Sequence, residues 1–378
     1  MKHIALAAAA AVLACQIAFA QQTVKIAGIV ELSGTGTTAG TNFKNGMELA
    51  VEEINAAGGI LGRKIDLENN DTQSNPAIAK ALTTKAIDND VYVVMGPVFS
   101  GSIIVSMAET RRAEVPNFTG GEAVNITLQG NPYVFRTSFS QATGMPKIAN
   151  YLENGLKTKS VVVMFVNNDF GKGGRDAIVK ELNARGIKVA ADISTDPGQV
   201  DFSSPVLRAK QATADALFAY LNEEESARLL RELRKQGYDK PIVGETTIMG
   251  QKVIELAGDA ANGVRGHVGL TIDAPNPAIK AFGEKYEKEF KSKSDHNGLK
   301  GYTGIYVVKA VTEKIGKFDR KAFAQAIKNS CFTAKQTPGL LMDVCFDEKG
   351  DIDRESFLVE VEGGQQVVIA TLPPLGKK

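Results

Sequence analysis

The chain of 378 residues has no tryptophan, only three cysteines and only three histidines. The histidines, His3, His267 and His296, show neither metal-ligand spacing nor the arrangement of a catalytic triad, and no Gly-x-Ser-x-Gly nucleophile elbow is present. Most Asp and Glu residues occur in stretches typical of solvated helix faces, such as residues 223–225 and 284–291, and no carboxylate pair is singled out for acid–base chemistry. We therefore expect a protein that is not an enzyme and that requires neither a metal nor a cofactor.

An excess of charge of either sign is also missing, since 44 Lys and Arg residues face 43 Asp and Glu residues. No basic block or tail suits nucleic acid. Beyond residue 20, no apolar run approaches the roughly 18 residues that indicate a membrane span. Nucleic acid and the bilayer interior are therefore not expected as partners, which leaves a small molecule as the main candidate.

The first 20 residues have the order of a secretory signal peptide. Lys2 and His3 precede the apolar run 4–13, and Ala18-Phe19-Ala20 forms a small-residue cleavage site. A membrane helix is the weaker interpretation, because the run is shorter than the ~20 residues that span a bilayer. Lipoprotein processing at Cys15 is a further alternative, but Leu13 is bulky where a small residue is preferred. We expect cleavage after Ala20 and a periplasmic location.

Cleavage after Ala20 leaves two cysteines, Cys331 and Cys345, in a chain sent to an oxidising compartment. An even pair in that setting predicts a disulfide. The alternative is a pair of reduced, buried thiols, because a single pair in a large domain is weaker evidence than a dense framework.

From residue 23 onward, β-branched apolar runs alternate with segments of helical periodicity. This order predicts parallel sheets with helices on both faces. The alternation restarts after about residue 142, and about 358 mature residues exceed what one core usually holds, so two doubly wound α/β units are expected. Strands are predicted at residues 24–30, 64–69, 91–95, 160–166, 187–191 and 214–220, and helices at 43–54, 75–87, from about 100, 171–185, 277–291, 301–314 and 320–328.

Two glycine-containing turns follow predicted strands. Residues 34–40 have the spacing Gly-x-Gly-x-x-x-Gly, which differs from the dinucleotide fingerprint and lacks a Walker lysine, so no nucleotide cofactor is expected. Backbone donors at such a helix N-terminus still suit a small anion or carboxylate. The second turn, Gly96-Pro97, leads to Ser100, whose hydroxyl can hold a carboxylate at a helix start. Alternatively, Ser100 only caps its own helix.

A set of motifs runs along almost the whole mature chain. The most specific is Ala-Val-Glu-Glu-Ile-Asn-Ala-Ala-Gly-Gly-Ile at residues 50–60. The others are residues 32–34, 46–49, 61–63, Asp71, the Gly-Pro-x-x-Ser turn at 96–100, 134–137, 168–173, 257–263 and 346–351. Together they resemble the motifs of the branched-chain amino-acid binding proteins of ABC transporters.

The resemblance implies the type I periplasmic binding protein fold, an α/β architecture of two doubly wound parallel-sheet lobes joined by three hinge crossovers. In this arrangement residues 1–20 are the signal peptide. Residues 21–141 and 270–343 form the N-terminal lobe, and residues 142–269 and 344–378 form the C-terminal lobe.

The resemblance also implies where ligand would bind. Ser100 matches the serine that binds the ligand carboxylate in the family. Gly120, Gly121 and Glu122 occupy the loop that binds the α-carboxylate and α-amino groups, and Glu122 departs from the threonine that relatives carry there.

Other ligand-binding positions depart further from the family. Ala39 stands where some relatives carry an aromatic residue, Phe170 replaces tyrosine, and Glu223 lies near a position that is often aromatic. Glu245 or Thr246 falls in the loop where relatives place an acidic residue against the ligand amine. A small residue at position 39 would leave room for a larger side chain on the ligand.

The expected function is that of an exported, monomeric solute-binding component of an ABC importer. It would capture a neutral or branched-chain amino acid by closure of its lobes and deliver it to a membrane permease. One alternative is the same carrier role for an aromatic or keto carboxylate without an amino group, and another is a ligand-sensing module for a membrane receptor. An ammonium group is expected on the ligand if Glu122 or Glu245 faces the cleft, and a simple acid if both face solvent.

Overall fold

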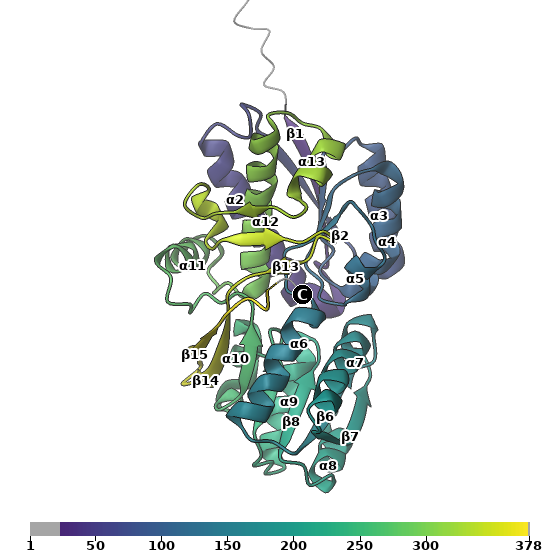
Figure 1. The fold of residues 1–378 in the computed structure, drawn as a ribbon, viewed down its shortest axis with the longest axis vertical. Helices are drawn as coiled ribbons and strands as arrows, with labels where there is room; N and C mark the ends of the chain where they lie inside the picture. Colours follow the sequence, from purple (N-terminus) through teal and green to yellow (C-terminus); the bar gives the residue numbers. More distant parts are fainter. Residues whose placement is uncertain (1–22, 377–378) are drawn as a thin grey trace, which may run out of the picture.

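The computed structural model describes residues 23–376, so the predicted signal peptide and Cys15 lie outside the described residues. Two α/β lobes stand end to end, and the chain crosses between them (Figure 1). The predicted fold class is therefore confirmed. Within residues 23–376, no helix is both long and apolar enough to cross a membrane.

The N-terminal lobe is built on a five-stranded, wholly parallel sheet with the order β2-β1-β3-β4-β5. The central strand β1 is buried on both faces, as its run of Val, Ile and Ala residues requires. The strands are β1 (Val24–Val30), β2 (Ile65–Asp71), β3 (Val93–Met95), β4 (Asn117–Thr119) and β5 (Val134–Arg136).

Helices cover both faces of this sheet, and local capping sets where several of them begin. The Asn75 side chain accepts from the N–H groups of Ala77 and Ile78, and Pro76 occupies the first helical position of α3. The helices of this lobe are η1 (Gly34–Gly36), α2 (Thr37–Ala56), α3 (Pro76–Asp88), α4 (Ser100–Ala113), α5 (Asn125–Leu128), α11 (Pro277–Phe290), α12 (His296–Ile315), α13 (Arg320–Ile327) and η4 (Pro338–Leu340).

Helix α12 begins earlier than its periodicity predicts, at His296 rather than at residue 301. Asp295 caps the helix by accepting from the N–H groups of Asn297 and Gly298, at 2.7 and 3.2 Å. The capped extra turn brings three side chains, those of His296, Asn297 and Lys300, to the space between the lobes.

The C-terminal lobe contains a seven-stranded sheet with the order β15-β14-β10-β9-β8-β6-β7. The five strands from β6 to β10 are parallel, whereas the hairpin β14–β15 adds an antiparallel edge that the sequence pattern did not predict. The strands are β6 (Ser160–Val166), β7 (Lys188–Thr195), β8 (Ala216–Tyr220), β9 (Ile242–Glu245), β10 (Arg265–Val268), β14 (Ser356–Glu362) and β15 (Gln365–Leu372).

The helices of the C-terminal lobe pack on both faces of that sheet (Figure 1). Their apolar residues point inward, as Ile178 and Leu182 of α7 and Leu229, Leu230 and Leu233 of α9 show. The helices are α6 (Gln141–Asn150), η2 (Tyr151–Gly155), α7 (Asp169–Ala184), α8 (Ser203–Gln211), α9 (Glu223–Lys235), α10 (Gln251–Ala257) and η3 (Gly258–Ala261).

A small three-stranded sheet, β11 (Cys331–Phe332), β12 (Val344–Phe346) and β13 (Ile352–Asp353), follows α13. Cys331 and Cys345 face each other across β11 and β12 and are joined by the predicted disulfide.

This small sheet packs on the N-terminal lobe. The N–H of Arg136 donates to the carbonyl of Gly350 at 3.0 Å, and the Phe346 ring packs edge-on against Phe118 and Phe135. The next strand, β14, pairs with β10 in the other lobe. We therefore propose that the third lobe boundary lies between β13 and β14, and not at residues 343–344 as expected from the sequence.

Candidate functional site

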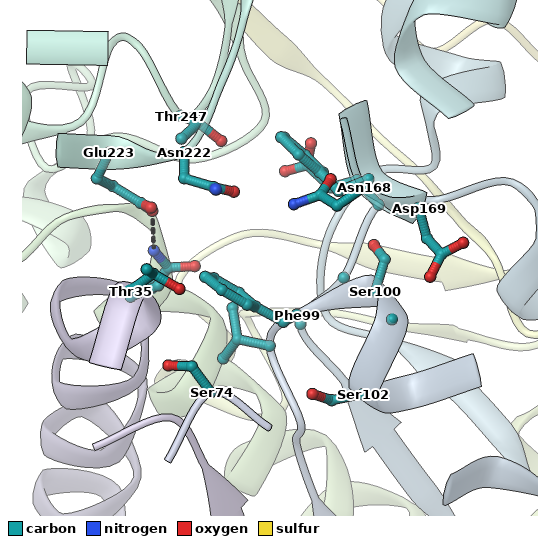
Figure 2. Close-up of a pocket in the computed structure, with 18 of the residues that line it drawn as sticks. Thr35, Ser74, Phe99, Ser100, Ser102, Asn168, Asp169, Asn222, Glu223 and Thr247 are labelled. Atoms are coloured by element: carbon teal, nitrogen blue, oxygen red, sulfur yellow. Dashed lines mark hydrogen bonds between the residues drawn. The ribbon is translucent and has the colours of Figure 1, made fainter. Parts of the chain in front are cut away.

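A cavity of about 220 Å³ lies between the lobes, and residues of both line it (Figure 2). From the N-terminal lobe, the predicted residues Ala39, Ser100, Gly120, Gly121 and Glu122 reach it. From the C-terminal lobe, Phe170 and Glu223 do so. The structure thus brings these predicted positions together around one enclosed space.

Glu245 and Thr246 are the predicted site residues that do not line the cavity, although the next residue, Thr247, does. The Glu245 carboxylate instead lies 2.9 Å from Nδ1 of His267 and accepts from the N–H of Thr246. Burial raises the pKa of Glu245 and lowers the pKa of His267 to about 3, so His267 is a neutral partner. This pair supports the cavity wall from behind.

The start of helix α4 presents unused hydrogen-bond donors to the cavity. The N–H groups of Ser100, Gly101 and Ser102 have no acceptor among residues 23–376, and all three residues line the cavity. Ser100 is the first helical residue and does not act as the cap, because Phe99 holds that position. Its Oγ accepts from the N–H of Ala123 at 3.3 Å, which leaves the hydroxyl proton free for a ligand. This corner, the Ser100 corner, is suited to a carboxylate.

Glu31 holds the turn that precedes α4, a role that the sequence analysis missed. Its buried carboxyl accepts from the N–H groups of Val98 and Phe99, each at 3.1 Å. Burial raises the pKa of Glu31 to about 7. The signal in the sequence was an acidic residue directly after the apolar run 24–30, at the strand end that faces the cleft.

The glycine-rich segment 34–40 is explained by close packing on the same residue. A Cβ atom at Gly40 would lie 2.1 Å from the carbonyl oxygen of Glu31, and one at Gly36 would lie 2.7 Å from the Glu31 side chain. These glycines are required because α2 starts directly against the end of β1. Thr35 and Ala39 from this segment line the cavity.

Lys300 supplies a buried positive charge that the sequence analysis also missed. Its Nζ lies 3.3 Å from Oε1 of Glu122 and 3.3 Å from the carbonyl oxygen of Gly120. Tyr220 donates to the other oxygen of Glu122 at 2.8 Å. Burial, together with the negative charge of Glu245, raises the pKa of Glu122 to about 7. Lys300 was missed because it lies one residue before the helix predicted at 301–314.

The opposite end of the cavity from the Ser100 corner is acidic. Figure 2 shows Glu223 across the cavity from Ser100, with the Phe99 ring between them. The expectation of a solvated helix face at residues 223–225 is wrong, because Glu223 and Glu225 are only 4% and 2% exposed. Glu225 lies in the capping box of α9 and accepts from the N–H groups of Asn222 and Gly198, whereas Glu223 meets Asn297 of α12 across the cavity. Burial, with the neighbouring charge of Glu224, raises the pKa of Glu223 to about 8.

Hydrogen bonds between the lobes close the cavity at its edges. Thr38 of α2 donates to Glu224 of α9 at 2.6 Å. The bond from Tyr220 to Glu122 and the 3.4 Å bond from Asn297 Nδ2 to Glu223 Oε1, dashed in Figure 2, also cross between the lobes. Among residues 23–376, no group of three or more His, Cys, Asp or Glu residues is arranged to hold a metal ion.

The buried carboxyl groups predict that the stability of the ligand-free protein falls between pH 6.5 and pH 8. The folded pKa values of Glu31, Glu122 and Glu223, about 7, 7 and 8, exceed the ordinary value of 4.5. In this window the folded protein therefore binds more protons than the unfolded chain, so raising the pH favours unfolding. At about 1.36 kcal/mol per pKa unit, we expect a loss of about 1–3 kcal/mol in the free energy of unfolding, measured by urea denaturation.

Groups whose titration makes the stability rise with pH act mainly outside the window from pH 6.5 to pH 8. His267 and His296 have lowered pKa values through burial, so they reduce stability only as the pH falls below about 6.5. Burial lowers the pKa of Lys147 to about 8, so its opposite effect starts above the window. A Glu223→Gln variant should show a shallower pH dependence. A stability that is flat or rises from pH 6.5 to pH 8 would contradict the prediction.

Comparisons with known proteins agree with this architecture. The family model described as periplasmic binding protein matches residues 23–366. The chain is 29% identical over 363 residues to the Leu/Ile/Val-binding protein BraC3 of Rhizobium johnstonii, which covers 94% of this chain and 97% of that protein.

Solved structures show the same fold. The leucine-binding protein LivK of Thermotoga maritima superposes with a TM-score of 0.84 at 25% identity, over 93% of this chain and 99% of that one. An ABC transporter solute-binding protein of R. palustris, solved with benzoate, superposes with a TM-score of 0.85 at 23% identity, over 94% and 98%. The chain therefore belongs to the family of periplasmic binding proteins.

Proposed function

We propose that the protein is exported, loses residues 1–20, and as a monomer carries a small carboxylate-bearing solute to a membrane permease. The observation that carries the proposal is the Ser100 corner, where a free hydroxyl proton and free N–H groups at the start of a 14-residue helix face an enclosed cavity. Residues of the second lobe cover the same cavity, so a bound ligand would contact both lobes. Ligand would thereby favour the closed state through its higher affinity for it.

The charge arrangement favours a carboxylate without an α-amino group over an amino acid. Glu122 faces the cavity, which by itself would indicate an ammonium group on the ligand. However, Lys300 already places the protein's own ammonium group against Glu122 and the Gly120 carbonyl. An α-ammonium would therefore meet acceptors that are occupied and a positive charge at close range. A neutral or branched-chain amino acid is the second candidate, supported by the Leu/Ile/Val-binding relative.

Replacing Ser100 by alanine should weaken ligand binding strongly. A hydrogen bond to a charged group contributes about 1.5–3 kcal/mol, so the dissociation constant is expected to rise roughly 10-fold to 150-fold. Isothermal titration uses leucine against 4-methyl-2-oxopentanoate, which form a matched pair, and phenylalanine against benzoate. The titrations measure the rise of the dissociation constant in Ser100→Ala, and they show whether the protein prefers amino acids or acids without an amino group. We expect the acids without an amino group to bind more tightly.

Ser106→Ala is the matched control, since it makes the same change on the same helix. Ser106 is buried, bonds only to carbonyls within α4 and does not line the cavity. Its ligand affinity should equal that of the unaltered protein. Equal affinities of Ser100→Ala and Ser106→Ala for every binding ligand would contradict the role of the Ser100 corner. Tighter binding of the amino acids would select the second candidate.

A further inference from the structure

A buried oxygen atom at the Glu223 end of the cavity lacks a hydrogen-bond donor. The amide oxygen of Asn297, a residue only 1% exposed, has no partner among residues 23–376. Its neighbour Glu223, which is 4% exposed, accepts at Oε1 from Asn297 Nδ2 at 3.4 Å. Both residues line the cavity. The end of the cavity remote from Ser100 therefore presents an acceptor, Asn297 Oδ1, that residues 23–376 leave unused.

Neighbouring groups hold this acceptor in place and do not compete for it. Asp295 accepts from Asn297 Nδ2 at 3.4 Å, so the amide nitrogen is shared between two carboxyl groups and the amide oxygen is directed elsewhere. The nearest buried cation on the same helix, Lys300, is engaged by Glu122 and Gly120. A donor for the amide oxygen of Asn297 must therefore come from whatever fills the cavity.

The unmet hydrogen bond has an energetic consequence. A buried polar group without a partner costs about 1–3 kcal/mol, and a bound group that supplies the missing donor recovers that loss. Burial raises the pKa of Glu223 to about 8 and that of Asp295 to about 6. Near neutral pH Asp295 is therefore the charged member of the pair, and its charge disfavours a second carboxylate on the ligand.

We propose that Glu223 and Asn297 form a second polar subsite, which binds an O–H or N–H donor at the end of the ligand remote from its carboxylate. This inference rests on the proposed carrier function and narrows its substrate class. The solute has one carboxylate, held in the Ser100 corner, an apolar middle beside Phe99 and Phe170, and a hydroxyl or amino group at its far end.

The position of the subsite links recognition to closure. Glu223 lies on α9 of the C-terminal lobe, and Asn297 lies on α12 of the N-terminal lobe. A donor group bound between them contacts both lobes at once. It therefore adds affinity for the closed state specifically, and a ligand without the donor leaves the Asn297 oxygen unpaired when the lobes close.

The test compares acids that differ only in the far-end donor. Isothermal titration of the full mature protein uses benzoate against 4-hydroxybenzoate, hexanoate against 6-hydroxyhexanoate and 6-aminohexanoate, and phenylalanine against tyrosine. For the pair that fits the cavity, we expect the donor-bearing member to bind at least 10-fold more tightly. A stronger effect of the amine than of the hydroxyl would identify the donor as cationic.

Two variants assign the preference to the subsite. In Glu223→Leu, the ratio of the affinities for the donor-bearing and the donor-lacking ligand should fall to near unity, while the donor-lacking ligand still binds. Asn297→Leu should lower this affinity ratio as well. Glu232→Leu makes the same change on α9 outside the cavity and should keep the full ratio.

The outcomes separate this inference from the carrier function. If donor-bearing and donor-lacking acids bind the unaltered protein equally well, the subsite is refuted and the carrier function stands. If Glu223→Leu keeps the same affinity ratio as the unaltered protein, the donor binds elsewhere and the subsite is likewise refuted. If no acid of these pairs binds, and neither leucine nor 4-methyl-2-oxopentanoate binds, the carrier function itself is overturned.

Discussion

Replacement of Arg136 by methionine is expected to lower the free energy of unfolding by about 3–5 kcal/mol, because it leaves several buried acceptors without a donor. Arg136 is fully buried at the end of β5. Its guanidinium pairs with Asp351 and donates to the carbonyls of Gly121 and Ala123 at 2.7 and 2.6 Å.

The same side chain also positions the ligand-binding loop. The carbonyls that it holds belong to residues 121 and 123, and the N–H of Ala123 is the donor to Ser100 Oγ. Loss of Arg136 should therefore reduce ligand affinity as well as stability. Urea denaturation with and without ligand measures both effects.

Arg136→Lys provides the control for charge. It keeps a positive charge for Asp351 but has no planar fork to reach both carbonyls. An intermediate loss of stability is therefore expected. If Arg136→Met lowers the free energy of unfolding by less than about 1 kcal/mol, a magnitude typical of an exposed ion pair, the buried network does not stabilise the fold.

Replacement of Gly301 by alanine is expected to lower the free energy of unfolding by about 2–3 kcal/mol through overpacking. Helices α2 and α12 cross at Gly46 and Gly301, and this is the most extensive helix contact in the molecule. A Cβ atom at Gly301 would lie 2.1 Å from the backbone carbonyl oxygen of Phe43. Because that neighbour is backbone, the helices must move apart.

The displacement should also affect binding, since α12 carries Asn297 and Lys300 and the start of α2 carries Ala39. Thermal or urea denaturation measures the stability, and titration with ligand measures the affinity. We expect weaker binding of the same ligand by the variant that still folds.

Gly283→Ala is the matched control within helix α11. A Cβ atom there would meet only Ile272, at an ordinary contact distance of 3.8 Å. Alanine should therefore stabilise the protein by about 0.5–1 kcal/mol through its helix propensity. If both variants behave alike, the close approach of α2 and α12 does not require glycine at position 301.

Local patterns were sufficient for the architecture. The alternation of β-branched runs with helical periods predicted two parallel-sheet lobes, because strands that alternate with helices form a parallel sheet whose two faces the helices cover. The even pair of cysteines that remains after cleavage, in a chain sent to an oxidising compartment, was sufficient to predict the disulfide between Cys331 and Cys345. The hairpin β14–β15 was not predicted. Its antiparallel pairing with β10 depends on where the chain re-enters the C-terminal lobe, and a local sequence pattern does not show this.

The site was only partly predictable. Ser100 was identified from a turn at a strand end, where ligands bind in this kind of sheet, and Gly120, Gly121, Glu122 and Phe170 from the resemblance to branched-chain amino-acid binding proteins. Lys300 and Asn297 were not identified, because the helix start that presents them is set by the Asp295 cap, six residues before the predicted helix at 301–314.

Periodicity and the chemistry of single turns were therefore enough to predict the fold class, the two-lobe organisation and the Ser100 corner that we propose binds a carboxylate. Which charges meet, by contrast, depends on the folded arrangement of distant segments. Glu122 faces Lys300 and Tyr220, Glu245 faces His267, and Glu223 faces Asn297 across the cleft. These pairings join residues 22 to 178 positions apart, and the burial that raises the carboxyl pKa values exists only once the two lobes enclose them.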